Sequence, residues 1–137
     1  MIVPLLAALI AGDLASIRTE PLLEKRFERA LDNSGRSVDE ARRVYDQGDD
    51  KGFEAAIEEV QGSVKLAVQT LKDMGKHPSR NVRNYKRAEL KVRELLRRIE
   101  SFRLDVSIDH RDPVDKLRAS LHTTHEELLE AVMSRKP

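Results

Sequence analysis

The sequence predicts an all-α protein, an antiparallel up-down four-helix bundle. The 137-residue chain is 39% hydrophobic and 36% charged, which suits one modest core with a highly charged surface. Three Phe, two Tyr and six Gly are too few for a typical β-sandwich, β-barrel or Gly-rich nucleotide fold. Past residue 20, apolar residues recur at alternating spacings of three and four, the period of a helix, over four segments separated by turn signals.

The first predicted helix begins after Pro21, a residue that favours a helix N-terminus, and ends at Gly48. Gly35 lies in its middle and is expected to weaken or bend it. Its predicted core-facing stripe consists of Leu23, Phe27, Ala30, Ser34, Val38, Ala41 and Tyr45.

The second predicted helix opens near Asp49 or Asp50, either of which is a suitable N-cap, and ends before Gly75. It has the most regular apolar repeat in the chain, which predicts a buried face along its whole length. The stripe consists of Phe53, Ile57, Val60, Val64, Ala67, Leu71 and Met74.

A third helix is predicted after the polar loop 75–81, and a fourth after Asp112-Pro113, a cap followed by a proline. The basic tail Arg135-Lys136 would complement the dipole at the end of the fourth helix. The third stripe consists of Tyr85, Ala88, Val92, Leu95, Ile99 and Phe102. The fourth consists of Val114, Leu117, Leu121, Thr124 or His125, Leu128 and Val132.

These helices are long and their connections short, so neighbours should run antiparallel in a bundle over residues 18–135. The alternative architecture is a helical repeat, because Ala41, Tyr45 and Gly48-Asp49 are spaced like the turn of a tetratricopeptide unit. No second copy follows at the required spacing, and a single unit cannot bury its own apolar face. The sequence therefore favours the bundle.

Residues 2–11 form an uncharged, apolar run that is too short to span a bilayer but has the length of a signal-peptide core. The sequence therefore divides into residues 1–12, a predicted signal peptide, and residues 13–137, the helical domain. No Lys or Arg precedes the run, as a signal peptide would require, so the alternative is an apolar segment packed on the bundle. The protein is expected to be exported or periplasmic, and cytoplasmic if residues 1–12 are retained.

The residues that most catalytic motifs require are missing. The chain has no Cys, which excludes disulfides, thiolate catalysis and Cys-based metal sites. No Gly-rich phosphate loop or nucleophile elbow occurs, and the acidic run 46–57 fails as a calcium loop because Lys51 and Ile57 stand where Gly and Glu are needed. The sequence thus predicts a non-enzymatic protein with no cofactor.

Positive charge is concentrated in the third predicted helix and the loop before it. Residues 72–103 hold eleven Lys and Arg against four Asp and Glu, although the net charge of the whole chain is only +1. Spacings of three and four place several of these cations on one helix flank. The candidate partner-binding residues are Arg80, Arg83, Arg87, Lys91 and Arg98, a surface suited to an acidic partner or an anionic lipid.

Two other interpretations of this basic flank remain open. Its cations can pair with acidic residues of neighbouring helices, of which Asp46, Asp49, Asp50, Glu54, Glu58 and Glu59 are the most obvious. They can also contact nucleic-acid phosphates, but Tyr85 and Phe102 fall on the core stripe rather than among the cations, so nothing is placed to stack on bases.

A possible metal site is the pair His122 and His125 with Glu126 on the fourth predicted helix. Residues three apart share a helix face, and two imidazoles with a carboxylate can bind Zn²⁺ or Ni²⁺. The spacing differs from that of zinc proteases and of di-iron bundles, so a solvated or partly buried histidine pair is the simpler interpretation. A metal-binding or metal-sensing bundle is retained as an alternative function.

Two stretches, residues 13–17 with 23–26 and residues 86–91 with 93–98, resemble a group of uncharacterised exported bacterial helical proteins. The shared features are Asp13-Leu14-Ala15-Ser16-Ile17, Leu23-Glu24-Lys25-Arg26, Lys86-Arg87-Ala88-Glu89-Leu90-Lys91 and Arg93-Glu94-Leu95-Leu96-Arg97-Arg98. The resemblance implies export and no particular activity. With the basic flank, it predicts a structural or interaction protein of the bacterial envelope, and the long heptad-bearing helices also suit a homodimer.

Overall fold

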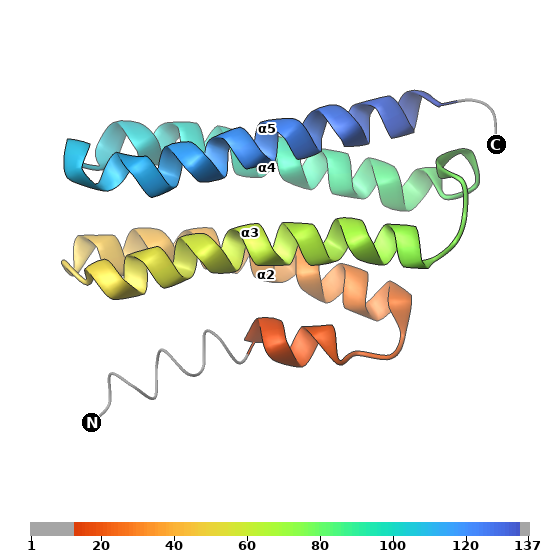
Figure 1. Cartoon of the computed structure of the whole chain (residues 1–137), viewed down its shortest axis with the longest axis horizontal. Helices are drawn as coiled ribbons and strands as arrows, with labels where there is room; N and C mark the ends of the chain where they lie inside the picture. Colours follow the sequence, from red (N-terminus) through yellow and green to blue (C-terminus); the bar gives the residue numbers. More distant parts are fainter. Residues whose placement is uncertain (1–12, 135–137) are drawn as a thin grey trace.

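The computed structural model describes residues 13–134, and helices account for most of this range. The long helices are α2 (Leu23–Asp46), α3 (Asp50–Asp73), α4 (Val82–Asp105) and α5 (Arg111–Met133), with short 3₁₀ turns at η1 (Pro78–Arg80) and η2 (Ile108–His110). Residues 13–18 form a further helical segment before α2 (Figure 1). No strand occurs between residues 13 and 134, so the all-α prediction is confirmed.

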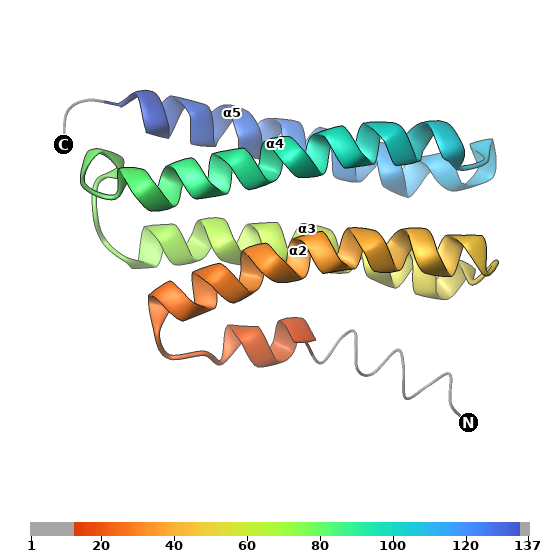
Figure 2. The same cartoon turned by 180° about the vertical axis from the view of Figure 1, so that it is seen from behind.

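The helices associate as two hairpins. α2 packs mainly on α3 and α4 mainly on α5, and the hairpins meet where α2 lies against α4 and α3 against α5. Figures 1 and 2 show the four helices side by side, with the chain reversing direction at each connection. The helical segment 13–18 lies on the outer side of the α2–α3 hairpin.

The predicted helix ends agree closely with the observed ones, because the turn residues act locally. The Asp49 side chain caps α3 by accepting a hydrogen bond from Gly52 N (2.9 Å). Gly48 and Gly75, with φ of 74° and 69°, adopt the left-handed conformation that ends α2 and α3. The predicted cap of the fourth helix is wrong: α5 begins at Arg111, so Asp112 lies in its first turn, where its charge favours the helix dipole.

The four predicted stripes form the core. Their central residues, including Phe27, Phe53, Leu95 and Leu121, are fully buried, while stripe residues near helix ends such as Tyr45 and Tyr85 are half-buried against the same core. Several buried core residues lie on the edges of the predicted stripes or outside the predicted helices. These are Leu14, Ile17, Leu31, Val44, Ala56, Leu96 and Val106.

Leu14 and Ile17 are buried because the segment 13–18 docks on α3, whereas the sequence placed the start of the bundle near residue 18. Gly62 permits this docking. A Cβ atom at Gly62 would lie 2.6 Å from Leu14 Cδ2, closer than two carbons can approach. A side chain at position 62 would therefore require the Leu14 side chain to move.

Small buried residues set the close approach of α2 and α3. Both helices bury several Ala and Ser side chains, whereas α4 buries one Ala and α5 none. Small side chains let helix axes approach, which explains why this hairpin has the most extensive contact in the molecule. The residues are Ala30, Ser34, Ser37 and Ala41 in α2 and Ala56, Ser63 and Ala67 in α3.

An aromatic cluster joins the two hairpins at the end where α2 meets α3. Tyr45 contacts Phe53, Phe102 and His110 with ring centroids 5.3–5.8 Å apart, mostly edge to face. Its hydroxyl accepts a hydrogen bond from Ser107 N (2.8 Å) in the α4–α5 connection. These contacts hold two connections far apart in sequence at one end of the molecule.

Two predictions, the signal peptide at residues 1–12 and the basic tail Arg135-Lys136, lie outside the described residues. Between residues 13 and 134, each helix is too polar or too short to span a bilayer.

We predict that Ala67→Leu lowers the free energy of unfolding by about 2 kcal/mol, because the added volume overpacks a fully buried site. Urea denaturation monitored by circular dichroism measures this change. Ala119→Leu, at an exposed position of α5, is the matched control and should change stability by less than about 0.5 kcal/mol. Equal effects of the two substitutions would contradict the close packing described here.

Candidate functional site

The predicted basic flank divides into two parts. Arg80 and Arg83, at and just after the η1 turn, are exposed, whereas Arg87, Lys91 and Arg98 of α4 are half-buried. Figure 2 shows α4 running beside α2. The five side chains therefore do not form one continuous surface. They line two separate pockets, one around Arg80, Arg83 and Arg87 and the other around Lys91 and Arg98.

The half-buried part is engaged with α2. Arg87 Nη1 lies 3.1 Å from Glu28 Oε1, and Arg98 forms an ion pair with Asp39 and a hydrogen bond to Gly35 O (3.4 Å). The acidic partners differ from those that the sequence suggested. Of those, Asp50 instead pairs with His110, and Glu59 bonds to Asn33.

Gly35 makes room for this engagement. The helix continues through it, and a Cβ atom there would lie 2.9 Å from Lys91 Nζ. The missing side chain lets the Lys91 ammonium approach the surface of α2, where Lys91 also lies 3.9 Å from Glu94. Lys91 and Arg98 thus act at the α2–α4 interface.

The exposed part differs in its surroundings. Arg80 and Arg83 line a shallow pocket of about 330 Å³ that also contains two glutamates of α2. Glu24 accepts a hydrogen bond from Asn84 Nδ2 (2.9 Å), and Glu28 pairs with Arg87, so both carboxylates already have partners. Between residues 13 and 134, neither Arg80 nor Arg83 lies within ion-pair distance of a carboxylate.

The proposed metal ligands do not converge. His125 Nε2 lies 2.9 Å from Glu89 Oε2 of α4, whereas His122 lies 3.8 Å from Glu100, two turns or more further along α4. Glu126 is exposed on α5. In the described part of the chain, no three His, Asp or Glu side chains are arranged to hold a metal ion.

Glu89 is the centre of a buried ionic cluster that the sequence analysis did not identify. The residue is only 3% exposed, and its carboxylate receives hydrogen bonds from Arg93 Nε (2.9 Å) and Nη2 (2.7 Å) in addition to the contact with His125. Burial by itself raises the pKa of Glu89, but the hydrogen bonds and charges of His125 and Arg93 outweigh it and leave the pKa lowered. The cluster joins α4 to α5.

Glu59 is the second buried carboxylate and has the opposite electrostatics. Its Oε2 accepts hydrogen bonds from Asn33 Nδ2 (2.9 Å) and from the Leu14 backbone N–H (3.2 Å), and Asn33 also donates to Ser63 Oγ (2.8 Å). Desolvation by burial raises the pKa of Glu59 above its ordinary value, because these neutral donors only partly compensate. This cluster attaches the segment 13–18 to the α2–α3 hairpin.

The fold also creates a hydrogen-bonded chain of Ser107, His110 and Asp50 that no sequence motif revealed. Ser107 Oγ lies 2.7 Å from His110 Nδ1, and His110 Nε2 lies 2.8 Å from Asp50 Oδ1. The backbone N–H groups of Ser107 and His110 already donate to Tyr45 Oη and Ser107 O, so neither is free to donate to a ligand. The Asp50 side chain is 74% exposed. His110 also packs edge-on against Tyr45 and Phe53. These contacts connect the α2–α3 hairpin to the α4–α5 hairpin at one end of the molecule.

We predict that Glu59→Gln raises the melting temperature at pH 7. Because its folded-state pKa is raised, ionised Glu59 reduces stability as pH rises through that pKa, whereas glutamine keeps an acceptor for Leu14 and Asn33 without a buried charge. Calorimetry between pH 4 and pH 8 should show the variant's advantage shrinking towards acid pH. Glu59→Ala, which removes the acceptor, should lose about 2 kcal/mol, and a Gln variant less stable than the parent at pH 7 would contradict the electrostatic assignment.

Glu89→Gln is expected to destabilise the protein at pH 7 by about 2 kcal/mol, because a neutral amide replaces the carboxylate that Arg93 and His125 contact. Since the folded-state pKa of Glu89 is lowered, its stabilising contribution is complete above the ordinary value of 4.5 and is lost as pH falls through the folded-state pKa. The difference between parent and variant should therefore narrow below pH 4.5. Glu130→Gln, at an exposed site of α5, serves as the control and should have the same stability as the parent at pH 7 and at acid pH.

No protein-family model, curated protein or solved structure matches this chain. The interpretation of its surfaces therefore depends on the geometry and chemistry of its own residues.

Proposed function

We propose that this chain is a non-enzymatic interaction protein of the bacterial envelope that offers a basic surface to an acidic partner or an anionic lipid surface. We define the α4-start surface as Lys76, Arg80, Arg83 and Lys86, all of which are exposed. We further propose that the chain is an antiparallel up-down four-helix bundle. The short connections and the pairwise packing of α2 with α3 and α4 with α5 support that architecture.

The observation that carries the proposal is the placement of positive charge at the wrong end of a helix. The first turn of α4 has no acidic residue, and residues 74–88 contain no Asp or Glu at all. The N-terminus of a helix carries a partial positive charge, so cations there are unfavourable for folding. Residues that break a local stability rule without compensation commonly serve binding.

The surroundings of Arg80 and Arg83 support the same conclusion. The two nearby glutamates, Glu24 and Glu28, are engaged by Asn84 and Arg87, and this leaves the exposed guanidinium groups available to an external anion. Val82, 47% exposed, adds an apolar contact between them. An exposed cationic surface with one exposed aliphatic side chain suits an acidic protein segment or a layer of lipid headgroups.

Export remains part of the proposal on the basis of the sequence. It rests on the apolar run 2–11, which lies outside the described residues, and on the resemblance to exported helical proteins. Mass measurement of the untagged native protein after cell fractionation would test it, since an exported chain would begin near Asp13 and be found outside the cytoplasm.

We predict that Arg80→Glu with Arg83→Glu weakens capture by phosphatidylglycerol vesicles, or by an acidic peptide, at least tenfold. The same variant should be as stable as the parent or more stable by about 0.5 kcal/mol, because acidic residues suit a helix N-terminus. Vesicle co-sedimentation and peptide anisotropy measure binding, and thermal denaturation measures stability.

Arg36→Glu with Arg97→Glu is the matched control, since it makes the same charge change at exposed positions away from the α4 start. Equal losses in both double variants would indicate binding through net charge alone and would contradict the proposed surface. A DNA duplex tests the nucleic-acid alternative, for which affinity must fall steeply with salt.

A further inference from the structure

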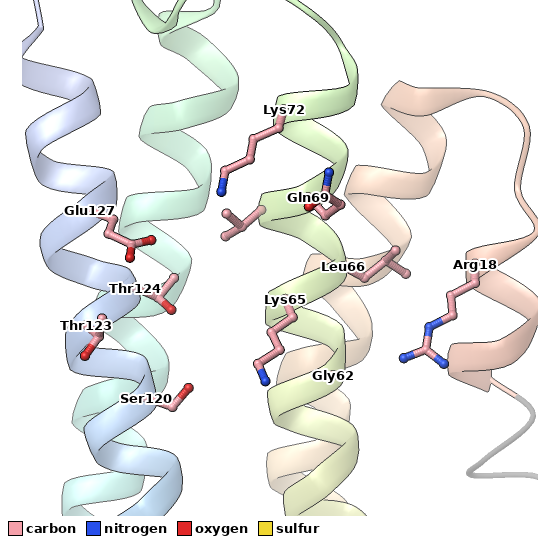
Figure 3. A pocket seen from close by; sticks show the side chains of 11 residues that line it. Arg18, Gly62, Lys65, Leu66, Gln69, Lys72, Ser120, Thr123, Thr124 and Glu127 are labelled. Atoms are coloured by element: carbon pink, nitrogen blue, oxygen red, sulfur yellow. The ribbon is translucent and has the colours of Figure 1, made fainter.

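A groove on a different face lies between α3 and α5. Its volume is about 660 Å³, within the range of small-molecule sites. Figure 3 shows Lys65 and Lys72 projecting from α3 towards Ser120, Thr123, Thr124 and Glu127 of α5, whereas Gln69 lies on the side of α3 towards Arg18. Arg18 of the segment 13–18 borders the groove on the far side of Gly62.

The charge of this groove is unbalanced. Arg18, Lys65 and Lys72 face a single lining carboxylate, Glu127. Among residues 13–134, none of these three cations lies within ion-pair distance of a carboxylate, whereas nearly every arginine at the helix interfaces is paired. Arg18 also favours the ionised form of buried Glu59, but through space rather than by contact. Cations without partners along one groove create a local positive potential that favours an anion.

The hydroxyl groups of α5 supply directed donors on the opposite wall. Ser120 Oγ accepts a hydrogen bond from Gln61 Nε2 (3.5 Å), so its own proton remains available. No hydrogen bond of the Thr124 hydroxyl occurs within the described residues, whereas Thr123 already donates to Ala119 O (3.2 Å). Ser120 and Thr124 can therefore donate to a ligand, and Thr123 can only accept.

Gly62 shapes the groove as well as the docking of the segment 13–18. It lies between Arg18 and Lys65, where a side chain would separate the two cations (Figure 3). The same missing side chain admits Leu14 against α3, which places Arg18 at the border of the groove. Leu66 and Val68 add apolar surface for the uncharged part of a ligand.

From these observations we propose that the α3–α5 groove binds a small phosphorylated molecule through Lys65, Lys72 and Arg18, with hydrogen bonds from Ser120 and Thr124. Lysine ammonium groups bind phosphate as point charges, and a tetrahedral phosphate accepts hydrogen bonds from several directions, as separate walls of a groove require. The site is independent of the α4-start surface.

Isothermal titration with tripolyphosphate, together with ¹⁵N–¹H spectra, tests this proposal. We expect saturable binding, shift changes centred on Gly62, Lys65 and Thr124, and at least a tenfold loss of affinity in Lys65→Gln with Lys72→Gln. Thr124→Val should weaken binding severalfold. Lys51→Gln with Lys116→Gln, the same charge change at exposed positions outside the groove, should bind like the parent.

Three outcomes would overturn the proposal: no binding at about 10 mM tripolyphosphate, weaker than almost any specific site; equal losses in the two lysine double variants; or shift changes confined to the α4 start. Stronger binding of a tricarboxylate than of tripolyphosphate would overturn the phosphate assignment. Arg80→Glu with Arg83→Glu should leave this titration unchanged, so that failure here and failure of the α4-start surface are separately visible.

Discussion

The close packing of α2 on α3 is the constraint on which the other features of this structure depend. Small residues such as Ser34 and Ala67 let the two helices approach, and this places Asn33 within hydrogen-bond distance of both Glu59 and Ser63. Glu59 in turn holds the backbone of Leu14, so the segment 13–18 docks on the same hairpin. The docked segment then brings Arg18 to the border of the α3–α5 groove. The close packing of α2 on α3 thus determines where Arg18 lies on the surface.

Electrostatic interactions in this protein serve two purposes that its near-neutral net charge conceals. Some cations hold the helices together: Arg87 and Arg98 join α4 to α2, and Arg103 joins α4 to α5 through Asp115. Such partly exposed pairs contribute little stability individually, about 0.5 kcal/mol each, but they favour one arrangement of neighbouring helices over others. Arg80 and Arg83 at the start of α4 have no such partner among the described residues, and neither do Arg18, Lys65 and Lys72 along the α3–α5 groove.

The two buried glutamates show how environment decides the behaviour of identical side chains. Glu89 has a guanidinium and an imidazole as direct partners, which keep its pKa low despite almost complete burial. The hydrogen-bond donors to Glu59 are the neutral Asn33 amide and the Leu14 backbone N–H, so the effect of burial dominates and raises the pKa of Glu59. Both residues are exposed in a simple helical-wheel view of the sequence, since charged side chains are usually assigned to the solvent face.

Local sequence patterns are enough to predict the all-α class, the ends of the long helices and most of the core. These properties depend on short-range patterns: the three-and-four spacing of apolar residues, the Asp49 cap, and the left-handed glycines Gly48 and Gly75. These patterns do not reveal residues whose burial depends on an element distant in the chain. Leu14 and Ile17 were missed because six helical residues carry too little periodicity to be recognised without the hairpin that buries them.

Which charged side chains have an ion-pair partner depends on the tertiary structure. Helical spacing placed Arg83, Arg87 and Arg98 on one flank, but whether each cation has a carboxylate partner depends on the neighbouring helix and its axial position. His122 and His125 illustrate the same limit, because side chains three apart on one helix turned to different carboxylates of α4. The groove lined by Arg18, Lys65 and Ser120 combines three elements distant in the chain, so no local pattern could reveal it. Periodicity fixes the direction of a side chain from its own helix, whereas the packing of helices fixes what that side chain meets.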